Sequence, residues 1–209
     1  MKDKLVIYGS GGLGRGVMEL VKTLNKDKEV WDVLGFIDDQ NDGYVNGYPI
    51  VGDLQFILEC SSSINVVLAI AEPKVKQDIL KKLKNNRNVL FPNLIHPNVY
   101  VPEHIKLGKG NIISYGVALS TNIEINNFNL IHYNCSVGHD VKIGDFNSIF
   151  PLSAISGYVR LEDGIVVGTN ASIIPNVLIS NNAIIGAGST IINDVKTNRK
   201  LVGTPGKEI

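Results

Sequence analysis

A histidine followed by an aspartate is the pair in this sequence best suited to acid–base chemistry. Gly138, His139 and Asp140 lie together in the segment VGHDVK. A neutral imidazole is the usual general base near pH 7, and a neighbouring carboxylate can orient it and stabilise its charged form. Neighbours in a strand point to opposite faces, so the sequence leaves open whether Asp140 reaches His139. A lone histidine in a repeated sequence is also often a plain turn residue.

A glycine-rich turn near the N-terminus indicates a site for a phosphate-bearing ligand. The segment GSGGLG at residues 9–14 satisfies GxGxxG between an apolar run and a helical pattern. Glycine permits close backbone approach, and a helix N-terminus favours phosphate. Asp38 and Asp39 follow the second expected strand, where an acid can bind a ribose hydroxyl or a base edge. Arg15 is a candidate diphosphate contact, or else a solvated arginine at a helix start.

The same motif occurs in NAD-binding domains, but the rest of the chain does not fit a dehydrogenase. The strand–helix alternation covers only residues 1–92, and a repeat rather than a second catalytic domain occupies the remainder of the chain. A purely structural turn is the other alternative. We interpret the turn as a site for a phosphate-bearing ligand of another kind.

Residues 1–92 alternate between strand and helix patterns. Apolar strands are expected over residues 4–8, 33–37, 65–71 and 88–91. Helical spacing of apolar residues follows the first strand, and Pro73 suits the first turn of a second helix. This alternation predicts a small Rossmann-like domain with a parallel sheet flanked by helices.

The chain changes character near residue 92. Residues 95–196 divide into 17 unbroken hexads, and every first position is Ile, Val or Leu. Such a period predicts a solenoid in which each hexad is a short strand plus a turn and three hexads close one coil of 18 residues. Gly, Asn and Asp at other positions suit corners with positive φ. The sequence therefore predicts two domains, residues 1–92 and 93–209, in an α/β plus β architecture.

Composition excludes several classes of protein. The 209 residues carry 20 basic and 20 acidic side chains, so the chain lacks the positive field of a general nucleic-acid binder. Two distant cysteines argue against a disulfide framework or a cysteine zinc site. No signal peptide or membrane-spanning run is recognisable, and the cytoplasm is the expected compartment.

Several motifs in order carry a family resemblance. They are the glycine-rich turn, the paired Asp38 and Asp39, NLIHP at the junction, NCSVGHDVKIGDFNSI within the hexads, and a closing VGTP. The chain resembles the hexapeptide-repeat sugar acyltransferases of the sialic acid O-acetyltransferase and nucleotide-amino-sugar N-acetyltransferase (bacillosamine, perosamine) branch. The resemblance implies that the solenoid is a left-handed parallel β-helix. It also implies that His139 is the catalytic base and Asp140 its partner.

The resemblance further implies an acetyl-CoA-dependent acetyltransferase of surface-glycan biosynthesis, such as O-antigen synthesis. The expected acceptor is the 4-amino group of a UDP- or dTDP-linked 4-amino-4,6-dideoxy sugar. Its nucleotide would be held through Gly11, Gly12, Leu13, Asp38 and Asp39. The alternatives are O-acetylation of a sugar such as sialic acid, and a non-catalytic scaffold that binds a nucleotide sugar.

Two positions depart from the family pattern. His132 stands where several amino-sugar N-acetyltransferases have Asn, and Leu13 stands where many members have His. His132 is a candidate substrate contact, but its identity leaves the sugar and the choice of N- or O-transfer open. No metal is expected, because the four histidines lack the HxxxxH spacing of β-helix carbonic anhydrases.

A filled solenoid has no room for a cofactor inside, so acetyl-CoA is expected on an outer face, walled in by a neighbouring copy in a homotrimer. Small or polar positions expected to face outward, with basic residues near the end of the chain, are candidate acetyl-CoA contacts: Ser148, Gly157, Thr169, Ala187, Lys196 and Arg199. The backbone N–H of Gly157, one coil beyond His139, is the expected oxyanion donor. A thioester is already activated, so no covalent acyl-enzyme is needed, and Cys135 reads as structural.

Overall fold

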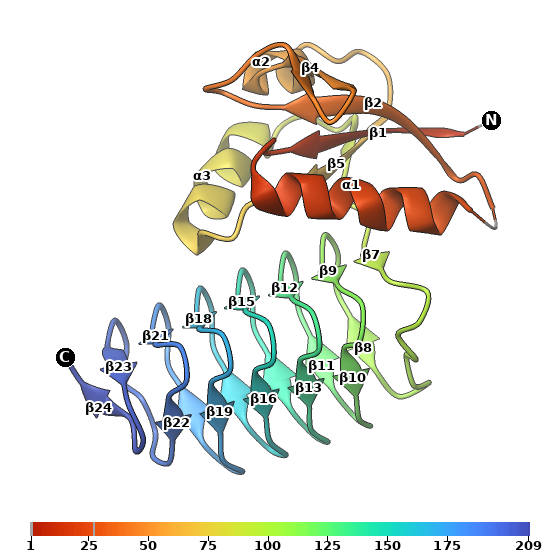
Figure 1. Ribbon diagram of the computed structural model, residues 1–209. Coiled ribbons are helices and arrows are strands. Elements are labelled where there is room, and N and C mark those ends of the chain that lie inside the picture. Colours follow the sequence, from red (N-terminus) through yellow and green to blue (C-terminus); the bar gives the residue numbers. More distant parts are fainter. Residues whose placement is uncertain (1, 27) are drawn as a thin grey trace. The chain divides into compact units, whose positions relative to one another are not determined.

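The computed structural model describes residues 2–26 and 28–209 (Figure 1). The chain divides into two compact units, Met1–Leu94 and Ile95–Ile209. Within the described residues, no helix combines the length and apolarity needed to cross a membrane.

The first unit is built on one six-stranded sheet. Its elements are β1 Asp3–Tyr8, α1 Gly12–Asn25, β2 Trp31–Ile37, β3 Tyr44–Val45, β4 Tyr48–Gly52, α2 Leu54–Leu58, β5 Ile64–Leu68, α3 Pro73–Leu83 and β6 Val89–Leu90. The strand order is β3-β4-β2-β1-β5-β6. All neighbours run parallel except β3 and β4. The predicted Rossmann-like parallel sheet is therefore confirmed.

A hairpin and a short helix extend the sheet beyond the sequence prediction. β3 and β4 are joined by Asn46 and Gly47, which both have positive φ, 50° and 81°. Asn-Gly between short β segments is a strong hairpin signal, since a two-residue primed turn needs positive φ at both positions. That signal was available in the sequence. Asp53 then caps α2, accepting a hydrogen bond from the Gln55 backbone at 2.9 Å.

The second unit is a solenoid in which the strands from β8 to β22 are two residues long and start six residues apart. The strands are β7 Leu94–Ile95, β8 Lys106–Leu107, β9 Ile112–Ile113, β10 Ala118–Leu119, β11 Glu124–Ile125, β12 Leu130–Ile131, β13 Ser136–Val137, β14 Lys142–Ile143, β15 Ser148–Ile149, β16 Ala154–Ile155, β17 Arg160–Leu161, β18 Val166–Val167, β19 Ser172–Ile173, β20 Leu178–Ile179, β21 Ile184–Ile185, β22 Thr190–Ile191, β23 Lys200–Val202 and β24 Lys207–Glu208. Successive coils pair in parallel at a separation of 18 residues, as between Ser136 and Ala154.

Three parallel sheets form the faces of this solenoid. We call them sheet D (β8-β11-β14-β17-β20), sheet E (β10-β13-β16-β19-β22) and sheet C (β7-β9-β12-β15-β18-β21-β23-β24). The repeat ends where Ile184 pairs with Lys200, two residues short of a full coil, and β23 turns back antiparallel into β24.

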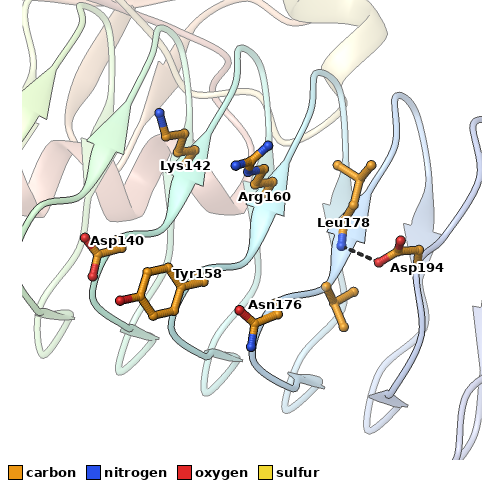
Figure 2. Close-up of a pocket in the computed structure, with 8 residues that line it drawn as sticks. Asp140, Lys142, Tyr158, Arg160, Asn176, Leu178 and Asp194 are labelled. Carbon is orange, nitrogen blue, oxygen red and sulfur yellow. Dashed lines mark hydrogen bonds between the residues drawn. The ribbon is translucent and has the colours of Figure 1, made fainter.

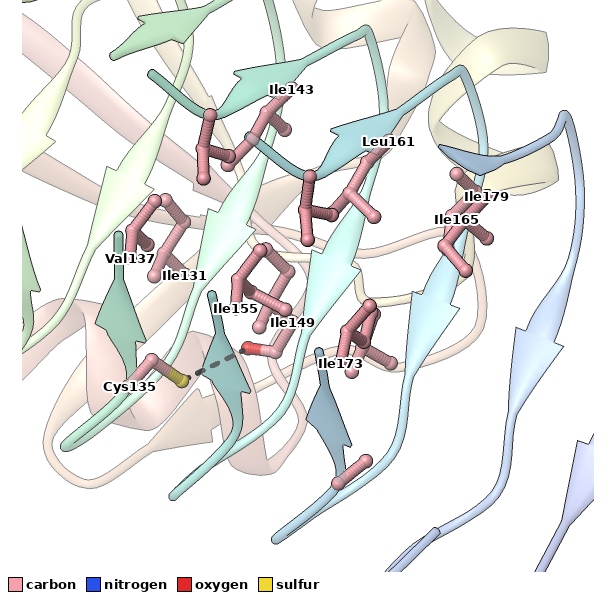
Figure 3. Close-up of a cluster of buried hydrophobic side chains, with 14 of the residues drawn as sticks. Ile131, Cys135, Val137, Ile143, Ile149, Ile155, Leu161, Ile165, Ile173 and Ile179 are labelled. Carbon is pink, nitrogen blue, oxygen red and sulfur yellow. Dashed lines mark hydrogen bonds between the residues drawn. The ribbon is translucent and has the colours of Figure 1, made fainter. Parts of the chain in front are cut away.

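The aliphatic first positions of the hexads form the solenoid core (Figure 3). From Ile131 to Ile191 every such side chain is at most 3% exposed. The fifth positions also point inward, and three of them are asparagines, Asn111, Asn129 and Asn147. These stack: the Oδ1 of Asn111 accepts from the Asn129 backbone at 2.9 Å, and the Oδ1 of Asn129 from that of Asn147 at 2.8 Å. The stack satisfies most of its buried polar groups between coils, and Nδ2 of Asn147 is left without a partner among the described residues.

Candidate active site

His139 and Asp140 occupy the corner between β13 and β14, where the chain passes from sheet E to sheet D. The Nδ1 of His139 lies 2.9 Å from Oδ2 of Asp140. The sequence left this contact open because strand neighbours diverge. Asp140 is not in a strand: its φ is 59°, a left-handed turn conformation that returns its side chain toward the imidazole. The two residues therefore form a hydrogen-bonded pair.

Two glycines shape the space around the imidazole. A Cβ on Gly157, one coil beyond His139, would lie 2.8 Å from both Cε1 and Nε2 of the ring. A Cβ on Gly138 would lie 2.5 Å from the backbone nitrogen of Gly157. Glycine at 157 thus makes room for the imidazole, and glycine at 138 leaves the Gly157 amide uncovered.

The Gly157 N–H makes no hydrogen bond to any other described residue. One coil further along the chain, the same position is Pro175, which has no N–H at all. Pairing between coils therefore does not use a donor at this position. Gly157 is itself buried, and within the described part of the chain its amide is an unpaired donor beside His139.

A groove of about 460 Å³ begins at Asp140 and runs along sheet D (Figure 2). Its charged lining includes Lys142 and Arg160, which follow Asp140 and Tyr158 by two residues each. Lys142 is paired with Glu124 at 3.2 Å. At its far end Asp194 accepts a hydrogen bond from the Leu178 backbone at 2.8 Å. The groove gives a polar ligand access to Asp140.

In the first unit, the glycine-rich turn presents free backbone to solvent. Gly11 and Gly12 are exposed, and Gly11 precedes α1 without any side-chain cap. Leu13 is half-buried, and the guanidinium of the exposed Arg15 lies beside Gly12, 3.9 Å from where a Cβ would be. Uncapped N–H groups with an adjacent guanidinium suit a phosphate.

The two aspartates after β2 are engaged with the protein itself. The Oδ2 of Asp38 accepts hydrogen bonds from the backbone N and the Oγ of Ser10, at 3.0 and 2.5 Å. Its Oδ1 accepts from the backbones of Gln40 and Asn41. Burial of Asp38 opposes ionisation, but these hydrogen bonds prevail and lower its pKa to about 2. Asp38 thus holds the glycine-rich turn in place.

Asp39 links two other elements. Its Oδ2 accepts from the hydroxyl of Tyr8 at 2.6 Å, and its Oδ1 from the backbone N of Leu54 at 3.0 Å. Burial, followed by the hydrogen bond to Asp39, raises the pKa of Tyr8. Asp39 is exposed, so each of its carboxylate oxygens keeps a further lone pair that faces solvent.

His132 lies at a different corner from His139, after β12, where sheet C leads into sheet E. Its ring contacts Tyr133 and Phe150, with ring centroids 4.5 and 6.4 Å away. Its Nδ1 accepts a hydrogen bond from the Tyr133 backbone at 3.0 Å, which leaves the proton on Nε2. Burial lowers the pKa of His132. The Nε2–H of His132 is therefore a hydrogen-bond donor at this corner. His132 and His139 lie at different corners of the solenoid.

The candidate acetyl-CoA contacts differ in their exposure. Ser148 is 0% exposed, and its sheet C neighbours Leu130 and Ile112 are buried too, so its side chain is not open to solvent and its role as an acetyl-CoA contact stays a prediction. Thr169, Ala187, Lys196 and Arg199 are exposed, and Arg199 is paired with Glu208 at 2.6 Å.

The structure offers little support for a cysteine nucleophile or a metal site. Cys135 is 1% exposed and burial raises its pKa to about 11, which makes it a poor nucleophile. Across residues 2–26 and 28–209, no group of three or more His, Cys, Asp or Glu side chains is arranged to hold a metal ion.

The residues that sequence reasoning missed are Asn122, Lys142, Tyr158 and Arg160. Asn122 and Tyr158 precede and follow Asp140 by 18 residues, one coil in each direction. The coil length was read from the hexads, so applying it to Asp140 as well as His139 would have found both residues.

Comparisons with known proteins agree with this arrangement. The family model for the PglD N-terminal domain matches residues 4–83. A histidine variant of perosamine N-acetyltransferase from Caulobacter crescentus, solved with CoA and GDP-perosamine, is 27% identical with a TM-score of 0.90, and the match covers 99% of this chain and 96% of that one. The acetyltransferase domain of PglB from Neisseria gonorrhoeae is 25% identical with a TM-score of 0.89, over the full length of both chains.

WeeI from Acinetobacter baumannii is 28% identical with a TM-score of 0.87, also over both full lengths. No curated protein matches significantly. The predicted fold class, a Rossmann-like domain followed by a left-handed β-helix, is confirmed. The predicted resemblance to nucleotide-amino-sugar acetyltransferases is confirmed as well.

Proposed function

We propose that this protein is an acetyl-CoA-dependent N-acetyltransferase that acts on a nucleotide-linked amino sugar. The match of residues 4–83 to the PglD N-terminal domain and the likeness of the β-helix to those of sugar N-acetyltransferases support this proposal. The observation that carries this proposal is the pairing of His139 with Asp140 at 2.9 Å beside the unpaired amide of Gly157. The proposed acceptor is the 4-amino group of a UDP- or dTDP-linked 4-amino-4,6-dideoxy sugar. The proposed setting is surface-glycan (O-antigen) biosynthesis in the cytoplasm.

His139 acts as the general base. An ionised carboxylate only accepts hydrogen bonds, so Asp140 keeps the proton on Nδ1 and leaves the lone pair on Nε2. As the sugar nitrogen attacks the thioester carbonyl, a C–N bond forms and Nε2 takes the proton that the nitrogen loses. The C–S bond then breaks, and the departing CoA sulfur receives that proton.

The Gly157 amide serves as the oxyanion donor. Negative charge develops on the thioester oxygen during attack, and a preorganised N–H stabilises it. Two features support this role: the Gly157 N–H has no partner among the described residues, and Gly138 adds no side chain over it.

The first unit binds the nucleotide. The backbone of Gly11, Gly12 and Leu13 would receive the diphosphate, with Arg15 adding charge. Asp39 keeps acceptor capacity toward a ribose or base, whereas Asp38 acts indirectly by fixing Ser10. His132, with its Nε2–H donor, is the proposed further contact to the substrate.

Acetyl-CoA lies against the outside of the solenoid in a homotrimer. Exposed Thr169 and Ala187 leave space for a pantetheine arm, and Lys196 and Arg199 supply charge for its phosphates. Light scattering tests the assembly, and a stable, fully active monomer would contradict it.

The decisive experiment measures release of free CoA thiol from acetyl-CoA. The acceptor panel contains UDP-, dTDP- and GDP-linked sugars with a 4-amino, a 3-amino or only hydroxyl groups. Turnover restricted to the amino sugars supports the proposal. Turnover restricted to hydroxyl acceptors would establish O-acetylation, and nucleotide-sugar binding without turnover would establish a scaffold.

A further inference from the structure

The carboxylate of Asp140 lies between two side chains, one from the coil before it and one from the coil after it. Asn122, Asp140 and Tyr158 all have left-handed backbone, with φ of 56°, 59° and 62°. The Oδ1 of Asp140 accepts a hydrogen bond from Nδ2 of Asn122 at 3.3 Å, while Oδ2 faces His139. Figure 2 shows the hydroxyl of Tyr158 directed toward this carboxylate from the other side. The carboxylate is thus held from the coil before and the coil after.

Tyr158 also touches His139 directly. The two rings meet edge to face, with centroids 5.0 Å apart and planes at 89°. The backbone N–H of Tyr158 donates to the carbonyl of His139 at 3.0 Å. One aromatic side chain therefore contacts both members of the pair.

The turn itself does not call for a tyrosine here. The equivalent positions in the two neighbouring coils are Asp140 and Asn176, and both of these residue types adopt left-handed φ far more readily than a bulky side chain. Tyr158 is 53% exposed, so it adds little to the core. Its contacts with His139 and Asp140 are what distinguish this turn.

We propose that Tyr158, together with Asn122, is a positioning residue that fixes the Asp140 carboxylate against Nδ1 of His139. This inference rests on the proposed function, in which Nε2 of His139 is the base. The hydrogen bond from His139, followed by those from Asn122 and Tyr158, lowers the pKa of the Asp140 carboxyl. A carboxylate that stays ionised and in place keeps His139 in the tautomer that leaves Nε2 unprotonated.

The test uses Tyr158→Phe, which removes the hydroxyl and keeps the ring. We expect kcat to fall about three- to tenfold, the effect of one lost hydrogen bond, with the KM values of both substrates unchanged. Nitrogen NMR of ¹⁵N-histidine-labelled protein without substrates should show His139 shifting from the Nδ1–H toward the Nε2–H tautomer. The matched control is Tyr115→Phe: Tyr115 is 51% exposed and meets His96 edge to face, also at 5.0 Å. It should change neither readout.

Asn122→Gly removes the second contact while tolerating the same φ, and Asn182→Gly, at φ 57°, is its control. Asn122→Gly should shift the tautomer in the same direction. If Tyr158→Phe folds poorly, Tyr158→Gly tolerates the same left-handed φ, has no donor to offer Asp140 and should show the same tautomer shift. A wild-type tautomer in Tyr158→Phe or Tyr158→Gly would overturn the inference. Absence of any acetyl transfer in the wild type would instead overturn the proposed function, since the NMR readout needs no turnover.

Discussion

The glycine-rich turn of the first unit and the histidine corner of the second hold their functional groups in opposite ways. The turn occurs once, and five donor groups converge on the Asp38 carboxylate to fix it. The corner is one of many equivalent corners, each held by backbone pairing between coils, as in the bond from the Tyr158 N–H to the carbonyl of His139. In the turn, the groups that shape the site also stabilise the fold. In the corner, the pairing between coils stabilises the fold and the side chains are free for chemistry.

The side chains at the corner illustrate this freedom. The positions equivalent to His139 in neighbouring coils are Thr121, Gly157 and Pro175, so four different residue types occupy one position of the coil. Substitutions at the corner should therefore separate activity from stability, whereas substitutions at Asp38 should change both. Three substitutions and one pH series test that contrast.

The largest effect is expected from His139→Ala. Loss of a general base costs about 10²–10⁴ in rate, and an exposed corner side chain contributes little to stability. We expect kcat to fall by that factor while the midpoint of thermal unfolding stays within about 2 °C. The measurement is thiol release alongside a melting curve. His104→Ala, at another exposed position, is the control and should keep full activity. A large drop in melting temperature would show that the corner is not independent of the pairing between coils.

Gly157→Ala should be the next largest effect. Its Cβ would lie 2.8 Å from the imidazole, so the ring of His139 must move. Misplacement of a catalytic group by about 1 Å can cost about 10²-fold, and a side chain can turn away at little cost in stability. We expect a loss of kcat of about 10- to 100-fold with near-normal unfolding. Retention of wild-type kcat would argue against the placement of the imidazole beside Gly157.

The sequence predicted the solenoid well because its signal is repeated. Burial of an aliphatic residue every six positions is the same physical requirement in every coil, so Ile131 and Ile185 were placed correctly by one rule. Single events were harder. The β3–β4 hairpin depends on one Asn46-Gly47 pair, and Ser148 occupies a nominally outward position that is nevertheless buried.

Site residues were predicted unevenly for the same reason. His139 and Asp140 were found as neighbours, but their contact depends on the left-handed φ of Asp140, which the strand alternation rule does not anticipate. Asp38 and Asp39 were predicted to be substrate contacts from their place after β2. Which of their oxygens the protein already uses depends on Ser10, Tyr8 and Leu54, which are brought in by the fold.

Asp38→Asn should affect binding and stability together. The amide cannot accept from all five donor groups, and hydrogen bonds to a charged group contribute about 1.5–3 kcal/mol. We expect the free energy of unfolding to fall by about that amount and the KM for the nucleotide sugar to rise, with the KM for acetyl-CoA unchanged. Asp42→Asn, at an exposed position, is the control. An unchanged unfolding free energy would remove the contrast with His139.

The smallest effect is the pH dependence of that same contribution. The pKa of Asp38 falls from 3.8 to about 2 on folding. A depressed folded-state pKa means that the stabilisation is present above pH 3.8 and is lost as the pH falls from there through about 2. Because the carboxylate is partly exposed, solvent screening reduces the contribution to about 1 kcal/mol. Urea unfolding of wild type and Asp38→Asn at about pH 6 and about pH 3 should therefore show a gap in unfolding free energy that narrows at the lower pH. A gap for Asp38→Asn that stays constant would mean that the turn is held by backbone geometry alone, like the corners of the solenoid.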